Sequence, residues 1–313
     1  MKIGLDMMGG DFAPREAVNG LRLFLSGTDT PATVFLFGDE AQVQPLLAEA
    51  GIPADRIRLV HAPQVIGMHE HPTKALKEKQ QSSIAVGYYY LAQGKIDALI
   101  SAGNTGAMMV GAHYSLKTID GVMRPTISTI IPRENGKTGL LLDVGLNADC
   151  KPELLNQFAI LGSLYAQAIL GIDTPRVGLI NIGEEEGKGN ILAQAAYPLL
   201  KENQRIHFVG NVEGRDVLED RADVMVCDGF TGNIILKLAE SFYDVTHRQS
   251  IHHEYLDRFN FEHYGGTPVL GINKPVIIGH GISQAPAFQN MLTLAARMVQ
   301  SDLLERITTA FRQ

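Results

Sequence analysis

Short apolar segments alternate with amphipathic segments along most of the chain, and a glycine or proline usually separates them. The segment Lys2–Met7 is typical of a buried strand, and Gly9 and Gly10 end it before a helical pattern that begins near Pro14. The same order recurs in Arg176–Gly183 and in the residues that follow it. Strands that alternate with helices of this length form a mainly parallel sheet covered by helices on both faces. The sequence therefore predicts an α/β fold.

Two helices and one hairpin are predicted individually. Helical spacing of apolar residues extends over residues 73–93 and again over 286–311. Gly94 suits the left-handed position that follows the end of a helix. The two apolar runs on either side of residues 133–137 have no long helix between them, so we expect a hairpin with these residues as its turn.

Composition and charge limit the class of protein. With 45% hydrophobic and 19% charged residues, the chain is typical of a globular protein. Its apolar runs are too short to span a bilayer, and Asp6 and Asp11 interrupt any signal-peptide pattern, so we expect a cytoplasmic protein. The net charge of −7 argues against nucleic-acid binding. Without a linker or a repeat, residues 1–313 are expected to form one continuous domain.

Five of the predicted strands end in a glycine followed by small polar residues. In a parallel sheet these ends lie at one edge, where ligands bind near a switch in strand order. Helices begin there too, and their unpaired N–H groups favour an anion. Each turn alone is also ordinary connection chemistry, but together we expect them to form one polar basin. The turns are Met8–Asp11, Ser101–Gly106, Asp143–Glu153, Asn181–Asn190 and Cys227–Asn233.

None of these turns has the GxGxxG pattern of dinucleotide-binding proteins or the GxxxxGK[ST] pattern of nucleotide-binding loops. The sequence therefore indicates no cofactor. A dehydrogenase is disfavoured because no acidic residue follows a glycine fingerprint at the required distance.

Seven segments carry a resemblance to a known family. They read LDMMGGDFAP, SAGNTGAMM, LLDVGLNADCKPE, NIGEEEGKGN, FVGNVEGRDV, CDGFTGNIILKLAE and YGGTPVLGIN. In order and spacing they resemble the bacterial phosphate acyltransferase family, from Lys2 to about the last helix. The resemblance implies a three-layer α/β/α fold, related to phosphate acetyltransferases and to the isopropylmalate dehydrogenase-like group, and it implies a homodimer.

The resemblance also implies an activity and partners. The family transfers an acyl group from acyl-acyl carrier protein to inorganic phosphate, and the acyl phosphate feeds phospholipid synthesis through a glycerol-3-phosphate acyltransferase of the membrane. Many members carry a longer, basic and apolar hairpin where this chain has HRQSIHHEYLDRFNFEH. We expect residues 240–265 to form a helical excursion that contacts a second subunit, the carrier protein or, transiently, the membrane.

The implied reaction needs no enzyme nucleophile, because phosphate itself attacks the thioester carbonyl and a pantetheine thiolate leaves. Holding the reactants together can lower the barrier by ~7–11 kcal/mol. Lys188 precedes a predicted helix start, so its charge and the helix amides can converge on one anion. Asn233 lies at another helix start, and His280 can protonate the leaving sulfur. We predict that these three residues and Glu184 are catalytic.

Three consecutive glutamates, Glu184 to Glu186, cannot all face one point. We expect Glu184 to orient Lys188 or a basic residue of a neighbouring strand, while the others stay solvated. A magnesium site is the alternative, although we predict no metal, because Mg²⁺ would need further carboxylates in octahedral geometry. The carboxylates that could complete such a site are Asp143, Asp149 and Asp228.

The other predicted contacts are with phosphate, the acyl substrate and the carrier protein. Those for phosphate and substrate are Gly9, Gly10, Asp11, Ser101, Asn104, Thr105, Gly106, Asp143, Asn147, Lys151, Asn211, Asp228 and Thr231. Those for the carrier protein are Lys74, Lys77 and Lys79, which share part of one predicted helix face. A solvated helix face without a partner is the alternative for these lysines.

A covalent acyl-cysteine route is disfavoured. Cys227 lies in a predicted buried strand, and the charge of Asp149 should raise the pKa of the neighbouring Cys150 thiol. Two other functions stay open. One is a short-chain phosphate acetyltransferase that uses acetyl-CoA, and the other is a non-catalytic module that binds the carrier protein.

Overall fold

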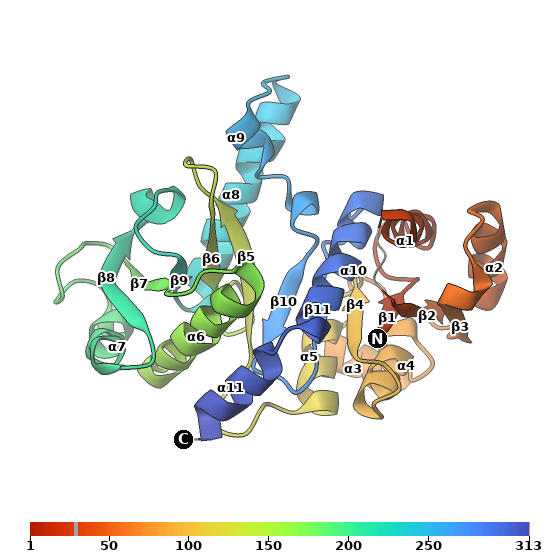
Figure 1. Cartoon of the computed structure of the whole chain (residues 1–313), viewed down its shortest axis with the longest axis horizontal. Helices are drawn as coiled ribbons and strands as arrows, with labels where there is room; N and C mark the ends of the chain where they lie inside the picture. The colour runs from red at the N-terminus through yellow and green to blue at the C-terminus, as the bar shows by residue number, and fades with distance from the viewer. Residues whose placement is uncertain (28–30, 313) are drawn as a thin grey trace. The chain divides into compact units, whose positions relative to one another are not determined.

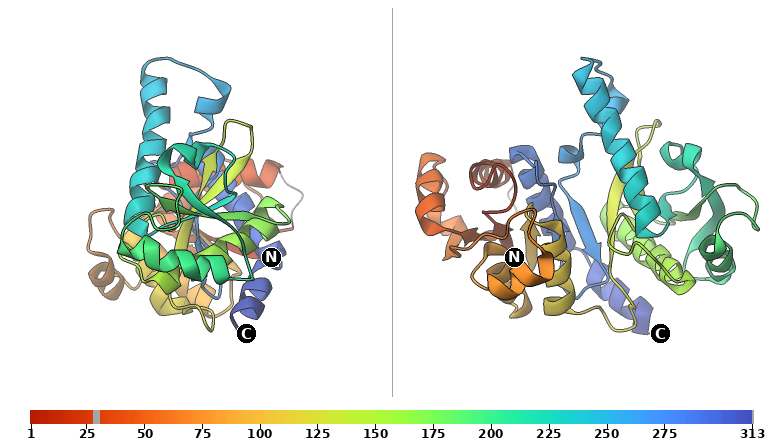
Figure 2. Two further views of the ribbon diagram at one scale, coloured as in Figure 1. Left: turned by 90° about the vertical axis from the view of Figure 1, so that its left-hand side faces the viewer. Right: turned by 180° about the vertical axis from the view of Figure 1, so that it is seen from behind.

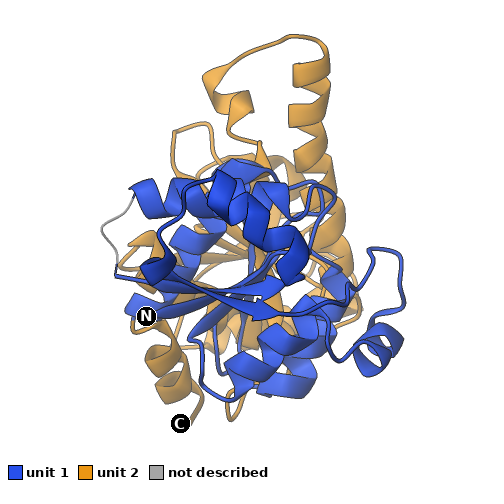
Figure 3. Ribbon diagram, turned by 90° about the vertical axis from the view of Figure 1, so that its right-hand side faces the viewer, with its two compact units in different colours: residues 1–118, 262–301 blue, residues 119–261, 302–313 orange. Residues whose placement is uncertain are grey.

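The computed structural model describes residues 1–27 and 31–312. The chain divides into two compact units, each built from segments far apart in the sequence (Figure 3). Unit 1 comprises Met1–Thr118 and Glu262–Ser301, and unit 2 comprises Ile119–Phe261 and Asp302–Gln313. The expectation of one continuous domain over residues 1–313 stays a prediction.

The strands of unit 1 lie in the order β3-β2-β1-β4-β11-β10 (Figure 1). Their bounds are β1 Lys2–Asp6, β2 Thr33–Gly38, β3 Ile57–His61, β4 Ala98–Ser101, β10 Thr267–Leu270 and β11 Val276–Ile278. Only the β10–β11 pair is antiparallel among the strand pairs formed by the described residues of this unit. The strand order reverses at β1, which pairs with β2 on one side and β4 on the other. Open parallel sheets bind ligands at such a point.

Helices lie on both sides of the unit 1 strands (Figure 3). They are α1 Arg15–Gly27, α2 Glu40–Glu49, α3 Pro72–Glu78, α4 Ser83–Ala92, α5 Thr105–Leu116 and α10 Ala285–Gln300. Helix α1 packs closely on α10, because a Cβ atom at Gly20 would lie only 2.3 Å from the Cβ of Phe288. The predicted helix end at Gly94 is confirmed: its φ is +67°, and the following N–H of Lys95 donates to the carbonyl of Tyr90.

The strands of unit 2 lie in the order β5-β6-β9-β7-β8. Their bounds are β5 Thr126–Pro132, β6 Thr138–Leu142, β7 Arg176–Asn181, β8 His207–Glu213 and β9 Val224–Val226. Strands β5 and β6 form the predicted antiparallel hairpin around residues 133–137. Strands β6, β9, β7 and β8 are parallel neighbours in that order, so their carboxyl ends share one edge.

The helices of unit 2 differ in how much of their surface is covered. They are α6 Pro152–Tyr165, α7 Ile191–Glu202, α8 Gly229–Arg248, α9 Glu254–Asp257 and α11 Leu303–Arg312. Helices α6 and α7 pack on the sheet, and a Cβ atom at Gly162 of α6 would lie 2.7 Å from Val224. Helix α8 extends past the ends of the unit 2 strands and turns back into α9 (Figure 2). Arg258 fastens this return, since it donates to the carbonyls of Arg133 and Lys137.

The predicted fold class is confirmed: each unit has a mostly parallel sheet with flanking helices. Two predicted helices are wrong in extent. Residues 73–93 form α3 and α4, because the Ser82 hydroxyl accepts the N–H of Ala85 and starts a new helix. Residues 286–311 are interrupted at Ser301, whose backbone is extended. Among residues 1–27 and 31–312, no helix combines the length and apolar character that crossing a bilayer requires.

Candidate functional site

The ends of β1 and β4 meet at the switch point of unit 1. Asp6 ends β1 and is buried, and it accepts hydrogen bonds from the Ser101 hydroxyl at 2.6 Å and from the N–H of Met8 at 2.9 Å. Burial raises the pKa of Asp6, while these hydrogen bonds act in the opposite direction. A Cβ atom at Gly9 would lie 2.5 Å from the backbone nitrogen of Gly103, so glycine permits the two strand-end loops to touch.

Asn104 connects residues 67–70, which precede α3, to this edge of the sheet. Its Oδ1 accepts the N–H of Ala107 at 2.9 Å, which caps α5, and the residue is only 4% exposed. Its Nδ2 lies 2.9–3.2 Å from three carbonyl oxygens. The acceptors are Gly67, Met68 and Glu70. The side chain predicted to bind phosphate is therefore already fully engaged within unit 1.

The other predicted residues of unit 1 vary in exposure. Asp11 and Thr105 are exposed, and His280 is half-buried. Gly10 has a φ of +101°, which only glycine adopts readily, and places the N–H of Asp11 2.8 Å from the carbonyl of Gly281. Asp11 and Thr105 therefore have side chains free to meet a ligand, whereas Ser101 and Asn104 do not.

In unit 2, Asp143 follows β6 and closes the next loop. It accepts the N–H groups of Gly145, Leu146 and Asn147 at 2.7–3.1 Å and the side-chain amide of Asn147 at 2.6 Å. Burial raises the pKa of Asp143, and the hydrogen bonds lower it in part. Asn147 also donates to the carbonyl of Pro125 at 2.9 Å. Both predicted binding residues thus hold the loop together.

The start of α8 rests on this loop. Asp228 caps the helix by accepting the N–H and the hydroxyl of Thr231 at 2.8 and 2.9 Å. Asn233 donates to the carbonyl of Val144 at 3.1 Å. A Cβ atom at Gly232 would lie 1.8 Å from the carbonyl oxygen of Asp143, so the helix approaches the loop backbone to backbone. Thr231 and Asn233 are therefore engaged in local structure.

The loop between β7 and α7 turns its charges outward. Glu184 pairs with Arg221 at 2.9 Å and Glu186 pairs with Lys201 at 2.8 Å. Lys188 is exposed, and in the described part of the chain no carboxylate lies within 4.0 Å of its ammonium group. Asn190 caps α7 by accepting the N–H of Ala193 at 2.8 Å. The loop therefore presents one unpaired cation beside a helix N-terminus, an arrangement that suits an anion.

The chain matches a family model described as fatty acid synthesis protein over residues 1–306. It is 41% identical to a phosphate acyltransferase from Dictyoglomus turgidum, with 98% of this chain and 96% of the relative covered. It is 43% identical to one from Desulforamulus reducens and 42% identical to one from Aquifex aeolicus, with the same coverage. The chain belongs to the phosphate acyltransferase family. This is a family of acyltransferase enzymes.

Solved structures agree with the fold of the chain. A phosphotransacetylase from Streptococcus pyogenes matches with a TM-score of 0.65 at 20% identity, covering 96% of this chain and 94% of that one. A 4-hydroxythreonine-4-phosphate dehydrogenase from Klebsiella pneumoniae matches with a TM-score of 0.55 at 13% identity, covering 96% and 98%. At these identities the likeness concerns the fold.

One of the two contacts predicted for Glu184 is present in the structure. Its carboxylate contacts Arg221, which precedes β9, and no ion pair joins it to Lys188 within the described residues. Across residues 1–27 and 31–312, no group of three or more His, Cys, Asp or Glu side chains is arranged to hold a metal ion. Asp143 and Asp228 instead accept hydrogen bonds from their own loops.

Neither cysteine has the character of a nucleophile. Burial raises the pKa of the Cys150 thiol to about 12, with further contributions from the charges of Asp143 and Asp228. The neighbour named from the sequence, Asp149, is not among these causes. Burial also raises the pKa of Cys227 well above its usual range. A thiolate is the reactive form, so both residues are poorly suited to carry an acyl group.

The three predicted docking lysines do not share one helix. Lys74 and Lys77 are exposed on α3, which ends at Glu78. Lys79 follows the helix and is half-buried, and its ammonium group donates to Glu70 at 2.5 Å and to the carbonyl of Val65 at 2.7 Å. Lys74 and Lys77 thus remain as the exposed part of the predicted patch.

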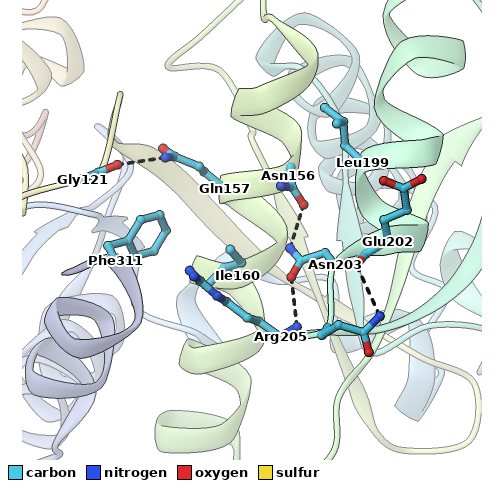
Figure 4. Close-up of a pocket in the computed structure, with 10 residues that line it drawn as sticks. Gly121, Asn156, Gln157, Ile160, Leu199, Glu202, Asn203, Arg205 and Phe311 are labelled. Carbon is cyan, nitrogen blue, oxygen red and sulfur yellow. Dashed lines mark hydrogen bonds between the residues drawn. The ribbon is translucent and has the colours of Figure 1, made fainter. Parts of the chain in front are cut away.

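A cavity of about 490 Å³ lies in unit 2 away from the predicted residues (Figure 4). Side chains of α6, α7 and α11 line it. Asn203 donates to Asn156 at 2.7 Å beside the cavity, along one of the dashed lines in Figure 4. Arg205 donates to the carbonyl of Ala310 at 2.6 Å. None of the residues predicted to bind phosphate lines this cavity.

Two buried polar residues at strand ends, Asp6 and Asn181, were not among the predicted site residues. A signal for Asp6 was present, because an aspartate ends an apolar strand twice, in GLD at Asp6 and in LLD at Asp143. Asn181 stands in the same position at the end of β7. In each case a polar side chain at the carboxyl end of a buried strand bonds to the loop that follows it.

Proposed function

We propose that this phosphate acyltransferase transfers a long-chain fatty acyl group from acyl-acyl carrier protein to inorganic phosphate, and that the acyl phosphate is used for phospholipid synthesis. The observation that carries the proposal is the state of Lys188. Its neighbours Glu184 and Glu186 have their own cationic partners, so the lysine charge is available to an anion.

The proposed reaction forms a carbon–oxygen bond and breaks a carbon–sulfur bond. A phosphate oxygen attacks the thioester carbonyl carbon, and the pantetheine sulfur leaves as a thiolate that takes up a proton. Lys188 and the first N–H groups of α7 stabilise the phosphate charge, as cations and helix N-termini do elsewhere.

Two rivals remain to be tested against this function. A short-chain phosphate acetyltransferase would use acetyl-CoA, and a non-catalytic module would bind the carrier protein without releasing thiol. The membership of an acyltransferase family supports catalysis. The preferred length of the acyl chain distinguishes a short-chain acetyltransferase from the proposed long-chain acyltransferase.

One assay distinguishes these functions. Purified protein is mixed with palmitoyl-carrier protein and phosphate, and acyl phosphate and free thiol are measured. We expect both products in equal amounts, with acetyl-CoA a much poorer substrate. A preference for acetyl-CoA would favour the first rival. Binding of the carrier protein without thiol release, in the presence of phosphate, would favour the second.

Carrier-protein docking is proposed for the exposed lysines of α3. Lys74 and Lys77 lie at a spacing of three, so both charges are on neighbouring positions of the helix surface. Reversal of both to glutamate should raise KM for palmitoyl-carrier protein about tenfold and leave KM for palmitoyl-CoA unchanged, because steering acts on the acidic carrier. Equal changes for both substrates would contradict docking at α3.

A homodimer is proposed through α8. Five large apolar side chains recur along one stripe of this helix and are 40–64% exposed. They are Phe230, Ile234, Leu238, Phe242 and Val245. Spacing of three and four residues is that of helix–helix contact, and a two-fold dimer places the same stripe of both copies together. Lys237 and Glu240 at its margin supply both signs of charge, which suits a self-complementary pair.

The dimer proposal is tested by light scattering on a size-exclusion column. Leu238→Lys should convert the dimer to a monomer, because it places a charge in the middle of the stripe. Lys201→Glu on α7 provides a charge-changing control away from α8. A wild-type monomer at working concentration would remove the proposal.

We place the protein in the cytoplasm, in transient contact with the membrane, where a glycerol-3-phosphate acyltransferase consumes its product.

A further inference from the structure

Two asparagines from neighbouring strands hold the backbone of the loop that carries Lys188. Asn181 ends β7 and Asn211 lies in β8, which pairs with β7 in parallel. They are 9% and 4% exposed. Their side-chain amides donate to carbonyl groups of this loop, so they connect the sheet of unit 2 to the loop that carries Lys188.

Asn211 fixes one side of Lys188. Its Nδ2 donates to the carbonyl of Glu185 at 2.9 Å, and the carbonyl of Glu184 lies 3.5 Å away. The N–H of Lys188 donates to the same Glu185 oxygen at 3.0 Å. One carbonyl therefore joins the side chain of Asn211 to the backbone nitrogen of Lys188.

Asn181 fixes the other side. Its Nδ2 donates to the carbonyl of Lys188 at 3.1 Å, while its Oδ1 accepts the N–H of Ile182 at 2.8 Å. A Cβ atom at Gly189 would lie 2.2 Å from that Oδ1, and the φ of Gly189 is +97°, so a glycine is required for this approach. The N–H and C=O of Lys188 are both tied to β7 and β8, while its ammonium group stays exposed.

The orientation of the Asn211 side-chain amide lowers the stability of the folded protein. Its buried Oδ1 accepts no hydrogen bond from the residues that the structure describes. Rotating the amide by half a turn would bring Oδ1 against two carbonyl oxygens, so the amide is held in this orientation by the loop alone. An unsatisfied buried acceptor destabilises the protein. Asn211 is therefore suited to placing the loop more than to stabilising the unit.

We propose that Asn181 and Asn211 are positioning residues that aim the ammonium group of Lys188 at the phosphate. The inference deepens the proposed function and rests on the role given there to Lys188. It also changes the role predicted for Asn211, which acts through the loop backbone instead of touching the substrate. Misplacement of a charged group by about 1 Å can lower a rate about 100-fold, so the backbone contacts have a measurable consequence.

The first test is independent of activity. Deuterium uptake of peptides covering residues 183–190 is compared in the wild-type protein, Asn211→Ala and the control Asn203→Ala, which loses a hydrogen bond to Asn156 in the same unit. We expect faster exchange only in Asn211→Ala, with a melting temperature close to that of the wild type, because the orphan acceptor is removed together with the donor. Unchanged exchange in Asn211→Ala would overturn the proposal.

The second test separates positioning from a purely structural role. Asn211→Ala should raise KM for phosphate about 10- to 100-fold with a smaller change in kcat. In a Lys188→Ala background the same change should have almost no further effect, because both act through one ammonium group. If Asn211→Ala instead raises KM for phosphate by the same factor in the Lys188→Ala background as in the wild type, the proposal is overturned. If Lys188→Ala alone leaves kcat/KM unchanged, the role of Lys188 fails, and the exchange data then show whether the two asparagines still hold the loop.

Discussion

Two strand-end loops, the one after β4 in unit 1 and the one after β7 in unit 2, use their polar residues in opposite ways. In unit 1, Ser101 and Asn104 turn inward and bond to Asp6 and to neighbouring carbonyls. In unit 2, the loop after β7 leaves Lys188 exposed, with the flanking glutamates paired to other cations. A polar residue at a strand end can therefore hold neighbouring loops together or stay accessible to a ligand. Which of the two it does depends on its hydrogen-bond and ion-pair partners.

Removal of Lys188 should give the largest effect. Lys188→Ala is expected to lower kcat/KM about 10²- to 10³-fold, because loss of one preorganised donor commonly has that effect on a charged transition state. Initial rates of thiol release at several phosphate concentrations measure it. Lys201→Ala removes a nearby cation that is already paired with Glu186 and should have little effect. Equal losses of kcat/KM in Lys188→Ala and Lys201→Ala would show that an exposed, unpaired lysine and a paired lysine contribute alike.

Asn104→Ala should act on stability in unit 1. We expect a loss of about 2–4 kcal/mol, because the change removes a helix cap and leaves three partly buried carbonyl groups without their donor. Urea unfolding measures the change. The control Asn19→Ala in α1 loses one side-chain hydrogen bond to Glu16 and should change stability by less than about 1 kcal/mol. A stable Asn104→Ala protein with a large defect in phosphate binding would instead place Asn104 at the ligand.

We expect acid to destabilise unit 2 by protonating Asp223, which pairs with Arg133 and Arg176. This ion pair lies where β7 and β9 begin, at the ends of these strands away from the loop of Lys188. Burial acts to raise the pKa of Asp223, but hydrogen bonds and charge from Arg176, with help from Arg133, lower it to about 2, below the ordinary value of 3.8. Its stabilising contribution is present above about pH 4 and is lost as the pH falls toward 2.

Asp223→Asn checks this pH dependence. The variant should be less stable than the wild type at pH 7, and the difference should shrink between pH 4 and pH 2. Unfolding curves at several pH values measure it, with Asp302→Asn, which lies in an exposed pair with Arg306, as the control. A difference that stays constant down to pH 2 would show that the Asp223 charge contributes nothing.

Glu184→Gln should have the smallest effect. Its ion pair with Arg221 is exposed, and such pairs contribute about 0.2–1 kcal/mol, so we expect a change in kcat/KM of about fivefold or less. A loss close to that of Lys188→Ala would instead show that Glu184 orients the lysine during turnover, as the sequence also allowed. The rate assay used for Lys188→Ala makes the comparison direct.

Secondary structure was predictable where the cause is local. The glycine at 94 ends α4 because left-handed backbone suits it, and the turn at 133–137 produces the hairpin of β5 and β6. Strand β8 was missed because it mixes apolar residues with Gly210 and Asn211 instead of forming an apolar run. The break between α3 and α4 was missed because a serine cap interrupts an otherwise helical pattern.

The sequence by itself determined the alternation of strands and helices, the family, and the loops in which polar residues gather at strand ends. Only the tertiary structure decided what each polar side chain does. Asn104 bonds to residues more than 30 positions away, and Glu184 meets Arg221 across 37 positions. Periodicity and propensity act over a few residues, whereas a hydrogen-bond partner is fixed by the packing of distant segments. For that reason an engaged asparagine and an exposed lysine were not distinguishable before the fold was known.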